Sequence, residues 1–596
     1  MMTPDQIGVY TPVSEIFPDV QSDFETFKSL LHGLSRTDTL FWCARLNLVI
    51  SHSSDVDHLT RQQFGLNQFL MAEEINAVND FARRHGGPQR VMFFRGQLLE
   101  LLRWVVLYCH DHPGDGMTFE NPEVRRRFAQ AALLASDIWA KRVFENKFSL
   151  DGGVDIARER ALGPIRKSIE ATSSAPDLSK SLGRGWTLFR DYFPRYYQCF
   201  EEEFRSSTGL SVEEYYICLG AMITNFMNPR IGAGIFDSNL LGESTPYRGV
   251  LQKYITLESQ TADELRDALW GQVKRDANND QDAPPYDYRA LREKPILRAG
   301  DGRAIILDPV FYSEKASIGP LFLLTKKKSG DEANEIFGAF GNAFESYACD
   351  ILKRMFPDIS GVLTKRLSCN IHGTDQAGNE IEIDACLNDV TEIVLFEMKA
   401  VWIREDEILT EDYERYLQHL RKKYGVARGA SRDRRSKGVG QIARTIRLLA
   451  SREWLGQNKE FSETQLIYPV LVVHDPFLAA PVYGNSLASE FKTLLTPDAE
   501  LRSGELKKGQ IRIAPLIVMT VENLEDLETS IEHFGFRDLL ADYTRSCPDR
   551  LMSLHNFIAF SEYGQQMRHN RSIAAKGLEL LGKSQEAIFL TDSCTG

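Results

Sequence analysis

The chain of 596 residues lacks long hydrophobic runs and has no CxxC cysteine pair. Its longest apolar runs, such as Leu98 to Cys109, are interrupted by charge and fall short of the roughly 18–20 residues that a membrane-spanning helix needs. The nine cysteines are scattered, which is typical of reduced, mostly buried thiols and argues against a structural zinc site. No basic run followed by an apolar stretch marks a signal peptide. We therefore expect a soluble, cytoplasmic protein.

Motifs of several other protein classes are also missing. The sequence has neither a GxSxG nucleophile elbow nor an HExxH zinc motif, which disfavours the hydrolases that use them. No helix-turn-helix or zinc-finger signature indicates a module that reads nucleotide sequence. No fixed-period repeat indicates a solenoid. The hydrophobic fraction of 43% and the charged fraction of 26% are those of an ordinary globular protein.

Two regions with different apolar spacing lie on either side of the polar segment Asp276–Arg289. Before it, apolar residues recur at three- and four-residue spacing, which predicts helices. After it, the pattern predicts an α/β arrangement around one mixed sheet. The expected helices cover residues 331–356, about 405–424 and 441–455, and the expected strands cover 362–372, 379–387, 392–403, 466–475 and 511–521.

The fold class is therefore expected to be an α/β core, with a mixed central sheet flanked by helices, preceded by a large all-α N-terminal region. The length is consistent with roughly two to four domains. We expect a helical region, a linker with a short β segment, the α/β core and a C-terminal helical segment, over residues 1–280, 281–330, 331–525 and 526–596. The N-terminal region contains no motif of recognisable chemistry, and we expect it to act in sensing, assembly or specificity.

A pair of carboxylates is predicted to face each other across a hairpin. Along the first strand, Glu382 and Asp384 alternate with isoleucines, and along the second strand Glu397 and Lys399 share one face. Asn388–Asp389 supplies turn chemistry between the strands. A hairpin symmetric about residues 390–391 places Asp384 opposite Glu397, with their Cβ atoms about 4.5–5.5 Å apart.

Two opposed carboxylates repel each other and need a compensating charge. A divalent cation meets this need, and hard oxygen ligands on rigid strands suit Mg²⁺ or Mn²⁺. Lys399 projects on the same side and is suited to stabilising negative charge on a phosphate. Glu345 stands out as an acid in the otherwise apolar part of the helix before the hairpin. We expect it to reach the same site.

These elements resemble the PD-(D/E)xK (restriction-endonuclease-like) nuclease superfamily over about residues 331–520. The matching segments are Gly-Asn-Ala-Phe-Glu-Ser-Tyr, Ile-Asp, Glu-Met-Lys and Lys-Gly-Val-Gly-Gln at 341–347, 383–384, 397–399 and 437–441. Ile383 replaces the proline of the family name, and the segment from Ile403 to Lys437 is longer than a minimal core needs. The resemblance implies that Asp384 and Glu397 are metal ligands and Lys399 the catalytic lysine. It further implies an accessory acid at Glu345 and, at Gln441, a side chain that orients water or phosphate.

A basic segment follows the hairpin, although the chain has a net charge of −13. From Arg415 to Arg447 it has 11 basic residues and one acidic residue. A basic island on an acidic protein is an electrostatic footprint for a polyanion. The alternative is an ordinary solvated loop. The residues expected to grip phosphates without reading sequence are Arg421, Lys422, Lys423, Arg428, Arg432, Arg434, Arg435 and Lys437.

The expected function is that of a Mg²⁺-dependent nuclease that hydrolyses phosphodiester bonds. DNA is the expected substrate in preference to RNA. The resemblance places it in bacterial restriction or anti-phage (antiviral) defence. A homodimer, or a protein partner bound by the helical region, is compatible with this expectation. The alternative is a non-catalytic nucleic-acid-binding or scaffold protein that uses a nuclease-like fold as a grip. Divalent-metal binding that depends on Asp384 would separate the two, since a scaffold has no need of a metal.

Overall fold

The computed structural model of the chain describes residues 9–51, 58–85, 90–111, 119–144, 177–227, 235–237, 247–276, 287–358, 366–374, 378, 380–402, 413–425, 437–450, 461, 463–495, 511–547, 552–568 and 570–589. The chain divides into two units by its internal contacts. Unit 1 comprises residues 1–186, 201–324 and 574–596, and unit 2 comprises residues 187–200 and 325–573. Much of the expected boundary segment Asp276–Arg289, residues 277–286, lies outside the described residues. Units defined by contacts within the chain need not coincide with functional domains. The domain boundaries expected from the sequence therefore stay predictions.

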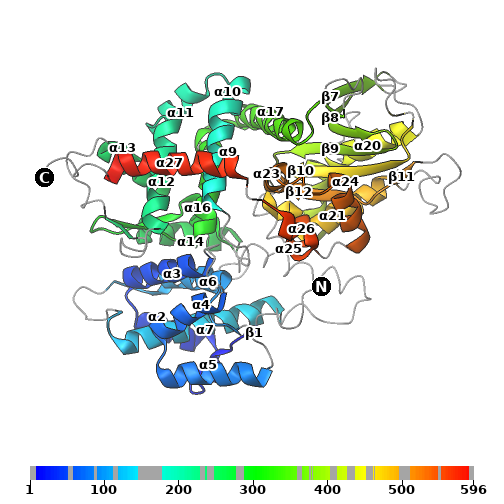
Figure 1. The fold of residues 1–596 in the computed structure, drawn as a ribbon. Helices are drawn as coiled ribbons and strands as arrows, with labels where there is room; N and C mark the ends of the chain where they lie inside the picture. The colour runs from blue at the N-terminus through cyan, green and yellow to red at the C-terminus, as the bar shows by residue number, and fades with distance from the viewer. Residues whose placement is uncertain are drawn as a thin grey trace. The chain divides into compact units, whose positions relative to one another are not determined.

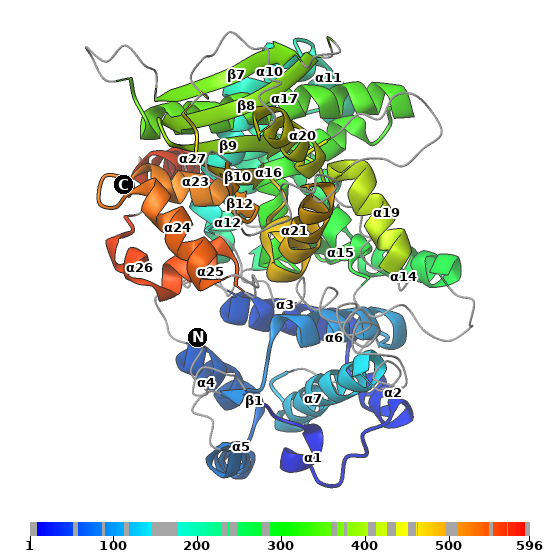
Figure 2. The same ribbon diagram turned by 90° about the vertical axis from the view of Figure 1, so that its right-hand side faces the viewer.

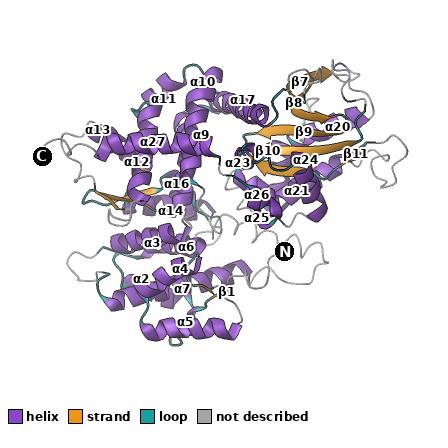
Figure 3. Cartoon of the chain, in the orientation of Figure 1, coloured by secondary structure: helices purple, strands orange, loops and turns teal. Residues whose placement is uncertain are grey.

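Unit 1 is mainly helical (Figure 3). Its helices of the N-terminal part are α1 (Val13–Ile16), α2 (Phe24–His32), α3 (Arg36–Ser51), α4 (His58–Phe69), α5 (Ala72–His85), α6 (Arg95–Tyr108) and α7 (Pro122–Phe144). Its further helices are α9 (Leu178–Thr187), α11 (Phe200–Thr208), α12 (Val212–Met227), α13 (Arg248–Glu258), α14 (Ala262–Asp276), α15 (Arg289–Glu293), α16 (Pro309–Thr325) and most of α27 (Arg571–Phe589). The expected helical N-terminal region is confirmed.

Short strands interrupt this helical unit, and the sequence did not predict most of them. β1 (Val9–Tyr10) pairs in parallel with β2 (Arg90–Val91). A four-stranded mixed sheet has the order β3-β6-β5-β4. Its strands are β3 (Ile235–Asp237), β4 (Ser259–Gln260), β5 (Ile296–Arg298) and β6 (Arg303–Ile306). Strands of two to four residues are too short to show an alternating pattern, which is why the sequence predicted only the run at β6.

Unit 2 contains a mixed sheet, as the sequence predicted, but with six strands instead of five, because the single strand expected over residues 511–521 is divided into two. Its strands follow the order β11-β10-β9-β8-β7, and β12 also pairs with β10. Figure 2 shows the run from β7 through β8 and β9 to β10. β7, β8 and β9 form an antiparallel meander, whereas β9, β11 and β12 all pair with β10 in parallel. The strands are β7 (Leu367–Thr374), β8 (Glu380–Asp389), β9 (Glu392–Lys399), β10 (Leu466–Val473), β11 (Arg512–Ile513) and β12 (Ile517–Thr520).

Helices such as α17 (Gly330–Met355), α20 (Val439–Ala450) and α21 (Pro481–Leu495) pack against this sheet (Figure 1). The other helices of unit 2 are η2 (Leu188–Tyr192) and α10 (Phe193–Tyr196), which pack on α17, and α19 (Tyr413–Tyr424), η6 (Pro476–Ala479), α23 (Val521–Glu528), α24 (Phe536–Ser546), α25 (Leu554–Phe560) and α26 (Glu562–Gln566). Residues 393–398 of β9 are all buried, because β9 is a central strand with both faces covered.

The long helix α17 begins at a capping box. The Ser329 side chain accepts a hydrogen bond from the Glu332 backbone, and the Glu332 side chain accepts one from the Ser329 backbone. Apolar residues at three- and four-residue spacing, including Phe340, Phe344 and Tyr347, are buried along one side of the helix. This packing fixes the position of Glu345, which lies between two of them in the sequence.

The hairpin register is confirmed where the β8–β9 ladder is continuous. Leu387 pairs with Val394 and Ala385 pairs with Phe396, so the next position along the hairpin sets Asp384 opposite Glu397. The strands extend through Asp389 and Glu392, so the turn itself consists of residues 390–391. Val390 has a positive φ of 65° there, and the Asn388 side chain accepts a hydrogen bond from its backbone N–H.

Across the described ranges, no helix has both the length and the apolar character that crossing a bilayer requires.

Candidate active site

Three carboxylates surround the ammonium group of Lys399. Its Nζ lies 2.9 Å from Glu397 Oε1, 3.4 Å from Glu345 Oε1 and 3.6 Å from Asp384 Oδ2. Glu345 comes from α17, Asp384 from β8, and the other two from β9. The structure thus brings together four of the five residues that the sequence analysis placed at the site.

Backbone pairing orients Asp384. Its Oδ2 accepts a hydrogen bond of 2.7 Å from the backbone N–H of Met398. On the other side of Asp384, the β7–β8 ladder pairs Cys369 with Ala385 and Ile371 with Ile383 but skips the position between them. Asn370, which occupies that position on β7, has a left-handed φ of 51°. The strand beside Asp384 is therefore locally irregular.

Burial dominates the electrostatics of the site. Burial, together with the charge of Asp384, raises the pKa of Glu345 to about 7, and Lys399 opposes this only in part. Burial is likewise the main cause that raises the pKa of Asp384 and, more strongly, that of Glu397. Burial alone would lower the pKa of Lys399, but the three carboxylates outweigh it and raise that pKa. The site holds more buried negative charge than one ammonium group neutralises.

The residues of the site fit a divalent cation. Glu397 Oε1 is buried and accepts no well-aligned hydrogen bond in the described part of the chain, since its contact with Lys399 is an ion pair. Asp384 and Glu397 offer hard oxygen atoms on neighbouring rigid strands. Within the described ranges no group of three or more His, Cys, Asp or Glu side chains is arranged to hold a metal. A cation held by Asp384 and Glu397 would complete its coordination with other oxygen atoms, such as those of water, as Mg²⁺ commonly does.

Gln441 lies beside the site rather than in the carboxylate cluster. Its Nε2 donates a hydrogen bond of 3.2 Å to the backbone carbonyl of Glu382, two residues before Asp384. Gln441 belongs to the first turns of α20, in agreement with the predicted helix start. The side-chain amide of Gln441 thus joins α20 to β8. The charge of Glu382 also raises the pKa values of Glu345 and Asp384.

The part of the basic segment that lies between α19 and α20 starts and ends at one place on unit 2. The backbone N–H of Lys437 donates to the carbonyl of Gly425 over 3.1 Å, so α19 ends where α20 begins. The Tyr424 hydroxyl donates to the carbonyl of Val401, two residues after Lys399. The end of α19 is therefore joined to the residues that directly follow β9, and the start of α20 is joined to the end of α19.

The predicted phosphate-gripping residues have different surroundings. Arg421 forms an ion pair with Glu490 at 2.9 Å, which neutralises part of the charge of Arg421. Lys422 and Lys437 are exposed, and Lys423 is half-buried. Four of the predicted residues lie outside the described residues, and they are Arg428, Arg432, Arg434 and Arg435.

One segment that the sequence analysis passed over matches the GxxxxGK[ST] phosphate-loop pattern, from Gly577 to Ser584. It lies entirely within α27, where the helix occupies the backbone N–H groups that a phosphate loop would point at its ligand. A Cβ at Gly577 would lie 1.9 Å from the Ser179 carbonyl oxygen, and the Ser584 hydroxyl bonds to the Leu580 carbonyl. These residues therefore serve close helix packing.

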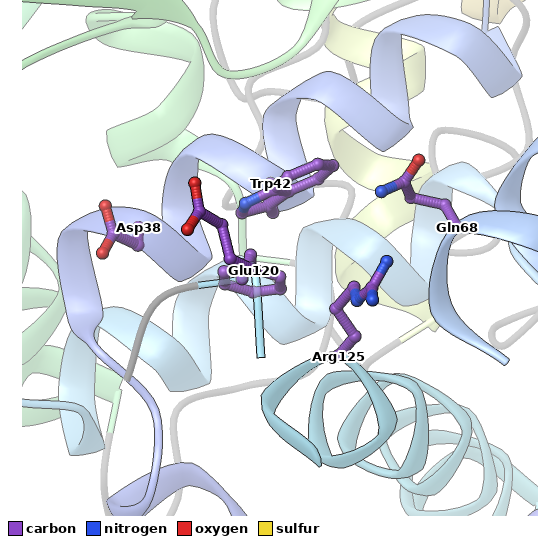
Figure 4. Close-up of a pocket in the computed structure, with 6 residues that line it drawn as sticks. Asp38, Trp42, Gln68, Glu120 and Arg125 are labelled. Carbon is purple, nitrogen blue, oxygen red and sulfur yellow. The ribbon is translucent and has the colours of Figure 1, made fainter. Parts of the chain in front are cut away.

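An open pocket of about 440 Å³ lies in unit 1 (Figure 4). It is lined by side chains from α3, α4 and α7 and from the residues just before α7, which are Asp38, Trp42, Gln68, Phe119, Glu120 and Arg125. None of the residues that the sequence analysis placed at the site lines it. It combines two carboxylates with an aromatic wall, in which Trp42 stacks on Phe119 at 5.1 Å between ring centroids.

Comparison with known proteins returned nothing: no protein-family model, no curated protein and no solved structure matches the chain.

Proposed function

We propose that unit 2 is a metal-dependent nuclease core of the PD-(D/E)xK kind, which hydrolyses phosphodiester bonds in DNA. The observation that carries the proposal is the convergence of Glu345, Asp384 and Glu397 on Lys399, from one helix and two paired strands. Supporting observations are the mixed sheet, the carboxylate-bearing helix before the hairpin and the helix-borne Gln441 after it. A role in restriction or antiviral defence stays a prediction from the family resemblance.

Asp384 and Glu397 are the residues that would hold Mg²⁺ or Mn²⁺. When bound, such an ion supplies a Lewis acid that lowers the pKa of water and neutralises charge on the scissile phosphate. The excess of buried carboxylates over cations at this site explains why a divalent ion would be favoured there.

The two remaining groups have complementary roles in proton transfer and charge stabilisation. Burial and the charge of Asp384 raise the pKa of Glu345 to about 7, and a carboxyl group with such a pKa is suited to accept the proton of an attacking water. Lys399 keeps its proton, because the surrounding carboxylates raise its pKa. It therefore acts as a fixed positive charge that stabilises the developing charge of the phosphate.

The basic segment between α19 and α20 would supply affinity for the sugar-phosphate backbone. Its described ends carry Lys422 and Lys437 exposed to solvent, and Tyr424 joins it to the strand of Lys399. Such contacts are independent of sequence and weaken as salt rises. These contacts would hold the bound DNA strand beside the carboxylate groups of the site.

The test is cleavage of plasmid, linear duplex DNA, single-stranded DNA and RNA with Mg²⁺ or Mn²⁺, comparing wild type with Asp384→Asn. Metal-dependent cutting by the wild type that the variant lacks is the expected result. Glu380→Gln is the matched control, because this glutamate is exposed at the start of the same strand and should leave cutting unchanged.

The second candidate is a non-catalytic protein that grips nucleic acid through the basic segment. The observation in its favour is that Lys399, a cation of the chain itself, pairs with all three carboxylates. Thermal unfolding with and without Mg²⁺ separates the two candidates. A grip protein binds DNA but shows no Mg²⁺-dependent rise in melting temperature that Asp384→Asn removes.

A further inference from the structure

The open pocket of unit 1 has charged groups of opposite sign on its two sides. In Figure 4 the carboxylates of Asp38 and Glu120 lie on one side of Trp42, and the side chains of Gln68 and Arg125 lie on the other. The pocket volume of about 440 Å³ falls within the range of about 300–1,000 Å³ that ligand pockets commonly have. The pocket therefore has both the size and the polarity to take a small molecule.

Packed aromatic rings hold one wall of this pocket in place. Trp42 on α3 stacks on Phe119, and Phe69 meets Trp42 edge-on with ring centroids 5.7 Å apart. Phe128 contacts both Phe69 and Phe119, at 4.6 Å and 5.5 Å between centroids. The three phenylalanines are buried. Because the rings interlock, the wall is formed before any ligand arrives.

The charged groups that line the pocket have no ion pair of their own. Asp38 lies one turn before Trp42 on α3, while Glu120 precedes α7 and Arg125 follows early within it. Among the residues that the structure describes, no ion pair or side-chain hydrogen bond engages Asp38, Glu120 or Arg125. Arg45 lies over the Trp42 ring, 4.9 Å from its centroid, but does not line the pocket. Two carboxylates and one guanidinium group are therefore available to a ligand.

This set of charges disfavours three classes of ligand. A nucleotide carries phosphate groups, which the two carboxylates repel and the single guanidinium group of Arg125 does not offset. A polyamine pairs with the carboxylates but is repelled by Arg125. A neutral apolar molecule would take water from three charged groups without replacing it by new partners. A ligand that balances all three charges carries two cationic groups and one anionic group.

We propose that this pocket binds a free basic amino acid of the arginine or lysine type. The side-chain cation of the ligand lies between Asp38 and Glu120, and its methylene groups pack against Trp42. Its α-carboxylate pairs with Arg125, and its α-ammonium group donates to the side-chain carbonyl of Gln68. The net charge of +1 on the ligand balances the net charge of −1 on the lining. The proposal concerns unit 1 alone and is independent of the proposed nuclease function.

Each ion pair in such a pocket should contribute modestly to affinity. Glu120 is exposed and Asp38 is half-buried, so both carboxylates stay partly hydrated. Loss of one pair should therefore weaken binding by about threefold to fivefold. Two analogues of arginine test the pairs separately, because agmatine lacks the α-carboxylate and citrulline has a neutral group in place of the guanidinium group. Both should bind more weakly than arginine by about this factor.

The experiment is isothermal titration calorimetry of the full chain with arginine, lysine, agmatine and citrulline. Arg125→Gln should reduce the preference for arginine over agmatine, whereas Asp38→Asn and Glu120→Gln should reduce the preference for arginine over citrulline. A general loss of structure would not produce this pairing of variant with analogue. The control is Glu123→Gln, because this exposed acid lies in the first turn of α7 outside the lining and should leave all four affinities unchanged.

Three results would overturn the proposal. They are no binding of arginine or lysine by the wild type, tighter binding of AMP than of arginine, and ligand preferences that none of the three pocket variants alters. The melting temperature without ligand shows whether each variant is folded. Glu120→Gln changes an exposed residue and keeps the test decisive if Asp38→Asn, in the first turn of α3, unfolds. Calorimetry does not depend on cutting, so failure of the nuclease proposal would leave this result intact.

Discussion

Met398 donates its backbone N–H to the carboxylate of Asp384 over 2.7 Å, across the hairpin from β9 to β8. Met398 lies between Glu397 and Lys399 in the sequence, so this one bond sets the position of Asp384 relative to both. The orientation of the carboxylate is therefore a property of the strand pairing rather than of a flexible loop. Placing chemistry on paired central strands keeps its groups at fixed separations.

The pKa of Glu345 predicts a pH dependence of stability. Burial raises this pKa from its usual 4.5 to about 7, so between these values the folded chain holds a proton that the unfolded chain has released. The stabilising contribution is full below pH 4.5 and is lost as the pH rises through 7. Urea unfolding from pH 5 to pH 8 without divalent ions should therefore show wild type losing more stability with pH than Glu345→Gln does. Parallel pH profiles would contradict the assignment.

Removing the ammonium group should expose the cost of the buried carboxylates. Lys399→Met leaves Glu397, which is fully buried, without its cation, and breaking a buried pair in this way costs about 3–5 kcal/mol. The loss should be largest at pH 8, because the raised pKa values let the carboxyls protonate at lower pH. When Glu397→Gln is also present, the stability lost through Lys399→Met should be smaller than in the otherwise wild-type chain. Strictly additive effects in urea unfolding would show that the two residues do not interact.

Charge reversal at the ends of the basic segment should weaken DNA binding. Lys422 and Lys437 are exposed, so Glu at either position should leave the fold unchanged. Each lost phosphate contact should reduce the slope of log affinity against log salt by about 0.9. Binding of a labelled duplex at several salt concentrations measures this slope. Arg421→Gln is an informative comparison, because Arg421 already pairs with Glu490 and should matter less for DNA. An unchanged slope in both lysine variants would refute the phosphate role.

A buried hydrogen bond behind the site should matter for stability. The Tyr347 hydroxyl donates to Glu525 Oε1 over 2.7 Å, and both side chains are buried. Tyr347→Phe removes the donor and should cost about 1–3 kcal/mol in the free energy of unfolding. Tyr192→Phe is the matched control, because its bond of 3.0 Å to Asp350 is only partly buried. Equal losses in the two variants would show that burial of the Glu525 acceptor is not the cause.

The hairpin register was predictable because alternation has a period of two and the turn left one symmetric solution. The Glu345 contact with Lys399 was inferred from an isolated acid among apolar helix residues, together with a family resemblance. The irregularity at Asn370 had no signal in the sequence, since it depends on how β7 meets β8.

The hydrogen bond from Lys437 to Gly425 has an evolutionary consequence. Because the two ends of the basic segment are fixed side by side, the residues between them can change in number and charge without altering the strand that carries Lys399. The entropic cost of lengthening such a segment grows only slowly, by about 0.6 kcal/mol for each doubling. This segment can therefore diverge among descendants of this chain while the β8–β9 hairpin is inherited intact.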